Sequence, residues 1–146
     1  HMYLRGTGIE IMAASDNVLR GGLTAKPVDV PELLRVLRFE ALDDPVVRPV
    51  PVRAGVQTWP VPVPDFALYR VCPEGDPVSV PPAGPRIALC LAGSVSVRDG
   101  AGEVELAKGQ AAFGPAGAGP VTVAGHGEVY LASTRADPGE SAPPEG

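Results

Sequence analysis

The sequence contains few of the residues that most often reveal chemistry. Among 146 residues there are two histidines and two cysteines, and aromatic residues make up 5%. Cys72 and Cys90 lack C-x-x-C spacing, which excludes a zinc ribbon. We expect both to be reduced, buried thiols, although they could pair if neighbouring strands bring them together. The hydrophobic fraction of 45% allows a real core, which must be built from Val, Leu, Ile and Ala.

Several partners and locations are excluded by what the chain lacks. No run of 18 apolar residues exists, so no membrane span is expected. No signal peptide is visible either, and we expect a cytoplasmic protein. The net charge is −5 and no basic stripe interrupts it, so nucleic acid is a poor candidate partner.

Proline and glycine are abundant, with 18 residues of each. Without a collagen repeat, this composition predicts many turns and short strands. The length allows one ordinary domain, or one small domain plus part of another. We therefore divide the chain into five parts, at residues 1–28, 29–42, 43–64, 65–135 and 136–146.

The first two parts contain a predicted strand and a predicted helix. Residues 3–12 are rich in β-formers, and Gly6 and Gly8 suggest a turn or bulge within them. Residues 30–39 carry one apolar stripe at helical spacing. Asp29 with Glu32 is typical of a capped helix start.

The rest of the chain predicts a mainly β fold. Six prolines make residues 43–64 an extended connector or edge strand, pinned to the core by Trp59. Residues 65–135 read as an antiparallel sandwich or barrel, and 136–146 as a disordered tail. The strands predicted within residues 65–135 are 66–71, 86–91, 94–97, 104–106, 110–113, 121–123 and 128–133. Ala92-Gly93, Asp99-Gly100 and the segment around His126 are predicted turns.

The first 26 residues hold the side chains with most chemical potential. His1 alone is a weak metal candidate, because zinc needs three or four ligands and neither histidine has a partner at metal spacing. Arg20 precedes Gly21-Gly22, so it could face a cleft and bind an oxyanion, or form a structural ion pair with Asp16. By spacing alone, Lys26 is a surface residue. His1-Met2 is also a common scar of expression cloning.

The same stretch resembles the signature of type I mannose-6-phosphate isomerases. The matching pattern is His1-x-Tyr3-Leu4-x-Gly6-x-x-Ile9-Glu10-x-Met12-Ala13-x-Ser15-Asp16-Asn17-x-Leu19-Arg20-x-Gly22-x-Thr24-x-Lys26. Met2, Gly21 and Ala25 depart from it, standing where the family usually has Ala, Ala and Pro. Further along, Gly-Pro-Arg-Ile at 84–87 and the segment 108–117 resemble the family's terminal cupin domain.

The resemblance implies an aldose–ketose isomerase that interconverts mannose 6-phosphate and fructose 6-phosphate. In the family one Zn²⁺ is held by a Gln, two His and a Glu, and the last His falls on His1. The signature Arg falls on Arg20, which we take as catalytic together with Asp16, while Tyr3 and Lys26 are assigned to the substrate. Glu10, which we expect to be buried beside Ile9 and Ile11, is favoured as structural.

The implied fold is a cupin-like antiparallel β-sandwich or barrel with one short helix, preceded by remnant strands of a second cupin barrel. We expect the C-terminal part of such an enzyme, inactive alone because its N-terminal part would supply three metal ligands. The 65–135 barrel is expected to be a metal-free scaffold. The alternatives are a non-catalytic cupin-like scaffold or sugar-binding module and, more weakly, a split enzyme. Exposed sheet edges make self-association plausible.

Overall fold

The computed structural model describes residues 4–12, 14–15, 18–81 and 84–134. The chain divides into two compact units. One comprises His1–Ile11 together with Val47–Gly146, and we call it the β unit. The other is Met12–Val46, which we call the helical unit. The five-part division made from the sequence stays a prediction.

The helical unit contains the helix α1, Val30–Val36. Asp29 caps it, because its Oδ1 accepts a hydrogen bond from the backbone N–H of Glu32 at 3.0 Å. The start is as predicted, but the helix ends at Val36 instead of residue 39, because the backbone of Leu37 is extended. No helix residue is buried, so the apolar stripe covers no core in the described part of this unit.

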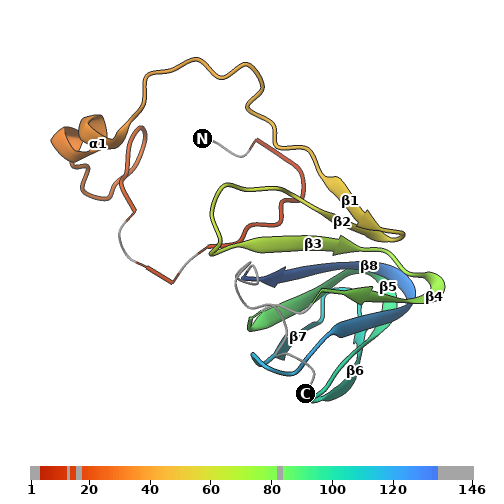
Figure 1. Ribbon diagram of the computed structural model, residues 1–146. Coiled ribbons are helices and arrows are strands. Elements are labelled where there is room, and N and C mark those ends of the chain that lie inside the picture. The colour runs from red at the N-terminus through yellow and green to blue at the C-terminus, as the bar shows by residue number, and fades with distance from the viewer. Residues whose placement is uncertain (1–3, 13, 16–17, 82–83, 135–146) are drawn as a thin grey trace, which may run out of the picture. The chain divides into compact units, whose positions relative to one another are not determined.

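The β unit is one eight-stranded antiparallel sheet (Figure 1). Its strands are β1 Val50–Arg53, β2 Val56–Thr58, β3 Ala67–Val71, β4 Glu74–Val80, β5 Arg86–Asp99, β6 Gly102–Ala107, β7 Ala111–Gly114 and β8 Val121–Ser133. They run in the order β1-β2-β3-β8-β5-β6, while β4 also pairs with β8 and β7 also pairs with β5. The expected mainly β antiparallel fold with a short helix is confirmed.

The two long strands β5 and β8 organise the sheet, because each pairs with several shorter strands along its length (Figure 1). A bulge interrupts their pairing between Cys90 and Ala92. On β5 the buried positions are even-numbered before the bulge and include odd-numbered Val95 after it. One extra residue therefore keeps the apolar side chains of both halves of β5 on the same face.

The core of the β unit is aliphatic, as the composition predicts. Its buried members are Val56, Val71, Val80, Ala88, Cys90, Val95, Leu106, Val121, Val123, Val129 and Leu131. Neither isoleucine nor an aromatic ring belongs to this buried set. Cys72 and Cys90 are free thiols as expected, but only Cys90 is buried, and Cys72 is half-buried.

Three sequence predictions about strands and turns are wrong, and one strand was missed. The described residues 4–12 form no strand. Ala92-Gly93 is no turn, because β5 passes through it, and His126 lies within β8 and not in a turn, although it is exposed as expected. The connector contains β1, which is an edge strand as predicted and tolerates Pro51, and β2, which lies between β1 and β3. The missed strand is β4, which contains Pro77 and has an irregular register between Gly75 and Val78.

Candidate functional site

The structure describes only part of the predicted active site. His1, Tyr3 and Asp16 lie outside the described residues. Arg20 is half-buried and Lys26 is exposed, and both belong to the helical unit. No hydrogen bond or ion pair joins these two side chains in the described chain. Their assignment to one pocket therefore stays a prediction.

The turn that carries Arg20 packs against the helix of its own unit. A Cβ added to Gly21 would lie 3.2 Å from Cδ2 of Leu33 in α1, so a small residue is favoured there. Gly22 has φ +70°, a backbone conformation that suits glycine. Gly21 thus allows a close approach to α1 and Gly22 adopts a positive φ, so the two glycines set the backbone directly after Arg20.

An apolar groove on the β unit brings residues 9 and 11 together with residues 59–68. It is lined by Ile9, Ile11, Trp59, Val61, Val63, Phe66 and Leu68, encloses about 240 Å³, and is called the outer groove below. A neighbouring hollow shares Ile9, Trp59 and Leu68 and adds Thr7, Leu91 and Tyr130. Ile9 and Ile11 are half-buried while Glu10 between them is exposed, which contradicts the sequence-based view of Glu10 as buried.

Trp59 connects this groove to the centre of the sheet. Its ring stacks on Tyr130 of β8, with ring centroids 6.2 Å apart and planes inclined by 23°. Beside it, the hydroxyl of Thr58 donates a hydrogen bond of 2.8 Å to the carbonyl of Leu68 in β3. Trp59 thus holds the connector to β8 through Tyr130, which is not a member of the buried core where the prediction placed the contact.

A polar cluster lies on the same sheet beside Tyr130. The Nε of Arg70 in β3 donates to Oε1 of Glu128 in β8 at 2.7 Å, and its Nη1 donates to Oε1 of Gln57 in β2 at 3.4 Å. The hydrogen bond to Glu128 raises the pKa of Arg70. Burial raises the pKa of Tyr130 and that of the Cys72 thiol, so both groups are held neutral. A neutral thiol is a poor nucleophile, which makes covalent catalysis by Cys72 unfavourable.

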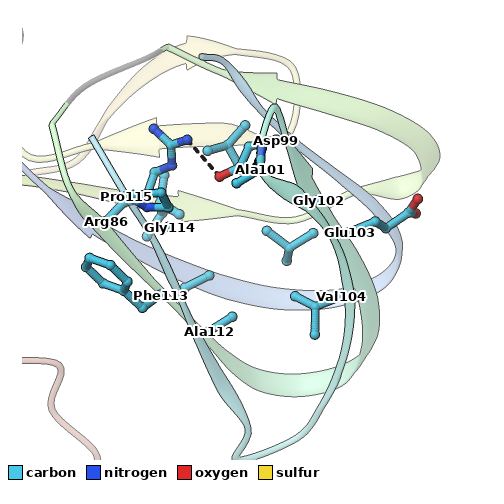
Figure 2. A pocket seen from close by; sticks show the side chains of 14 residues that line it. Arg86, Asp99, Ala101, Gly102, Glu103, Val104, Ala112, Phe113, Gly114 and Pro115 are labelled. Carbon is cyan, nitrogen blue, oxygen red and sulfur yellow. Dashed lines mark hydrogen bonds and ion pairs between the residues drawn. The ribbon is translucent and has the colours of Figure 1, made fainter. Parts of the chain in front are cut away.

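A second ion pair of the β unit lines a cavity of its own. Nη2 of Arg86 lies 2.7 Å from Oδ2 of Asp99, and their side chains are only 3% and 13% exposed. Figure 2 shows the two side chains pointing toward one another, while the carboxylate of Glu103 points away from them. The hydrogen bond from Arg86 lowers the pKa of Asp99. The pair forms one wall of a cavity of about 210 Å³ whose other walls are largely apolar.

The backbone of a neighbouring strand lies close to this ion pair. A Cβ on Gly114 would lie 2.8 Å from Nε of Arg86 and 2.9 Å from Oδ2 of Asp99. Asp99 also accepts a hydrogen bond of 2.8 Å from the backbone N–H of Ala101 through Oδ1, which holds the β5–β6 hairpin turn. Both carboxylate oxygens are thus engaged by the fold. The arrangement suits a structural clamp better than an acid–base catalyst.

Metal binding gains no support from the described residues. Across residues 4–12, 14–15, 18–81 and 84–134, no three His, Cys, Asp or Glu side chains gather into a possible metal site. His126 stands opposite Glu74 in the register of β4 and β8, but it is exposed and no third donor joins them.

Sequence reasoning missed both ion pairs of the β unit. Arg86 was read only as the first residue of a strand, and Asp99 only as a turn residue. The available signal was an Arg that shares the period-two spacing of the apolar residues Ala88 and Cys90, because a buried Arg requires an acidic partner.

In the described part of the chain, no helix is long and apolar enough to cross a membrane.

Comparison with known proteins places these features in a family. The family model described as mannose-6-phosphate isomerase, cupin domain, matches residues 55–133. Mannose-6-phosphate isomerase from Escherichia coli (strain K12) is 38% identical over 130 residues, which is 88% of this chain and 33% of that protein. The enzyme of the same name from Cryptococcus neoformans is 35% identical over 124 residues, covering 80% of this chain and 29% of the relative.

Solved structures agree with the sequence comparison. A mutant of phosphomannose isomerase from Salmonella typhimurium superposes with a TM-score of 0.74 at 30% identity, over 85% of this chain and 32% of that structure. The chain therefore spans about a third of the length of the relatives that it matches.

Proposed function

This chain belongs to the mannose-6-phosphate isomerase family through its cupin domain, and from that premise we propose that it is the C-terminal part of an aldose–ketose isomerase. The proposed reaction interconverts mannose 6-phosphate and fructose 6-phosphate. The observation that carries the proposal is the 38% identity to the Escherichia coli enzyme over 130 residues, a stretch longer than the matched cupin domain. The residues that complete the enzyme would come from the part of the relatives that this chain does not cover.

The exposed apolar side chains of the helical unit support the proposal that a further part of the protein covers it. None of its described residues is buried, although it contains large apolar side chains such as Leu23, Phe39 and Leu42, which are 98%, 80% and 73% exposed. Exposed apolar surface of this extent is typical of a segment that packs against another part of its protein. We propose that the remaining part of the enzyme supplies that cover, and that without it the chain tends to self-associate.

The chemistry assigned to the signature residues follows from the reaction. Exchange between an aldose and a ketose removes a proton next to a carbonyl and passes through an enediol. Arg20 would stabilise the developing negative charge on the enediolate oxygen through its guanidinium. Asp16 would relay the proton or hold Arg20 in place. Tyr3 and Lys26 would contact the sugar phosphate.

Zinc is the cofactor that we propose for the complete enzyme, with His1 as one of its ligands. Bound zinc would polarise the sugar oxygens as a Lewis acid. The described residues do not fit a zinc site by themselves, because they bring no three suitable donors together. The other ligands would therefore come from outside this chain. We also propose a cytoplasmic location, in keeping with the two free thiols.

The decisive test begins with the longest reading frame that contains this chain. We expect it to supply a Gln-x-His pair and a Glu upstream, and the encoded protein to isomerise mannose 6-phosphate in the presence of zinc. Arg20→Ala should lower kcat about 100-fold or more, as expected for loss of a group that stabilises transition-state charge. Arg38→Ala is the matched control, because Arg38 is an exposed arginine of the same unit, and it should leave kcat unchanged.

The 146-residue chain alone should bind zinc weakly and show no isomerase activity. Activity of the isolated chain would contradict its role as an incomplete part of the enzyme. A reading frame that begins near Tyr3 would favour the alternative, a non-catalytic cupin-like scaffold or sugar-binding module. Activity restored by co-expression with a separate chain would indicate a split enzyme.

A further inference from the structure

We infer that the outer groove of the β unit anchors residues 4–11 and thereby positions the signature residues on either side of them. In this view Ile9, Ile11 and Trp59 are positioning residues, and the cupin domain orients active-site residues without contacting the substrate itself. The inference rests on the proposed function for its catalytic consequence. The anchoring itself can be tested without any activity.

The first argument is the division of the chain. Residues up to Ile11 belong with the β unit, whereas Met12–Val46 forms a unit of its own, and the chain rejoins the β unit at Val47. The signature is therefore split between the two units. Its beginning belongs with the cupin domain, and its later part, with Arg20, belongs with the helical unit.

The second argument is the way in which the segment is held. Residues 4–11 form no strand, so no sheet ladder of the β unit fixes them. Their attachment comes from side chains, because the half-buried Ile9 and Ile11 line the outer groove together with Trp59, while Glu10 between them is exposed. Burial of two isoleucines is a non-directional attraction proportional to the apolar area covered, and it is lost when either side chain is made small or polar.

The third argument is that the groove has fixed walls. Trp59 stacks on Tyr130, which belongs to one of the two long strands of the sheet. Leu68 lies in β3, and its backbone carbonyl accepts the hydrogen bond from the Thr58 hydroxyl. A wall already held in its final geometry costs little to order when a segment packs on it. The anchored segment can therefore hold the flanking signature residues within the narrow tolerance that catalysis requires.

The anchor is tested on the 146-residue chain by trypsin cleavage after Arg5, an exposed residue of the anchored segment, followed by mass spectrometry. Cleavage after Arg20, in the helical unit, serves as an internal reference. The Trp59→Ala variant and the double variant Ile9→Ser with Ile11→Ser should be cleaved after Arg5 at least ten times faster than the wild type. The rate after Arg20 should not change.

Matched controls separate anchoring from folding. Trp59→Phe and Ile9→Val keep an aromatic or branched side chain in the groove, so both variants should be cleaved after Arg5 about as slowly as the wild type. Phe113→Ala removes a 69% exposed ring that lines the cavity beside Arg86 and Asp99, and this variant should be cleaved at the wild-type rate. Circular dichroism checks that every variant retains its sheet. Equal cleavage rates after Arg5 in folded wild-type, Trp59→Ala and double-serine proteins would overturn the anchor.

The positioning role is tested in the full-length reading frame. Trp59→Ala should lower kcat at least tenfold with little change in KM, and Trp59→Phe should recover most of the loss. An inactive full-length wild type would defeat the proposed function while the cleavage experiment still decides the anchor. An active wild type with an unaffected Trp59→Ala variant would defeat the positioning role alone.

Discussion

Two ion pairs of similar length, one in each unit, show how the two units of this molecule differ. In the helical unit, Nε of Arg35 lies 2.7 Å from Oε2 of Glu32, and the side chains are 70% and 38% exposed. In the β unit, Nη2 of Arg86 lies 2.7 Å from Asp99, with almost no exposure. The first pair loses little when broken because water replaces each partner, whereas the second is surrounded by protein. Distance alone therefore says little about what an ion pair contributes.

The same contrast holds for the two units as a whole. The β unit places eleven residues in a common buried cluster, whereas the described part of the helical unit buries none. A unit with a core resists local opening, and a unit without one depends on external contacts. The segment that carries Arg20 is thus the part of the chain whose order we expect to depend most on the rest of the enzyme.

The largest effect should come from breaking the buried ion pair. Arg86→Met leaves Asp99 charged and almost buried, and we expect the β unit to lose about 3–5 kcal/mol of unfolding free energy. Urea unfolding followed by the fluorescence of Trp59, the only tryptophan, measures this loss. Arg35→Met breaks the exposed pair and is the control, with an unchanged midpoint expected. Similar midpoints for the two variants would remove the contrast between the units.

A smaller effect should separate two glycines of nearly equal backbone conformation. Gly93 and Gly22 have φ of +72° and +70°. A Cβ on Gly93 would lie 2.0 Å from the carbonyl oxygen of His126, whereas one on Gly22 would meet nothing within 4 Å. Gly93→Ala should cost the β unit about 2–4 kcal/mol, through left-handed strain and overpacking.

Gly22→Ala serves as the comparison for that variant. It carries only the left-handed strain, about 1–2 kcal/mol, and only within the helical unit. The midpoint of Trp59 fluorescence should therefore stay at the wild-type value. If both variants shift this midpoint equally, the two units unfold together and the division between them does not hold in solution.

The smallest effect should come from the helix cap. Asp29→Ala removes the acceptor for the Glu32 N–H and should weaken α1 by about 1 kcal/mol. The far-ultraviolet signal at 222 nm should lose its small helical component, while the unfolding midpoint of the β unit stays unchanged. Asp29→Asn, which keeps an acceptor at the cap, should preserve the helical signal. A shifted β-unit midpoint would again argue against independent units.

The sequence by itself determined the local features of this protein. The cap at Asp29 and the hairpin at Asp99 depend on neighbours along the chain, and both were predicted correctly. The signature and the cupin-like segment also identified the family, because a long pattern of residue types needs no coordinates. The predicted site residues His1, Tyr3, Asp16, Arg20 and Lys26 rest on that resemblance.

Only the tertiary structure decided how distant segments meet. Ala92-Gly93 has the composition of a turn, but both residues pair with β8 inside one long strand, where Gly93 packs closely on the backbone of His126. Residues 4–12 have the composition of a strand, yet they pair with no strand, and Ile9 and Ile11 line a groove together with apolar residues from 59–68. The Arg86–Asp99 pair likewise joins the two ends of β5, which only the folding of the sheet brings together. Such contacts depend on which surfaces are available after the core has formed, and that information is not carried by any short stretch of sequence.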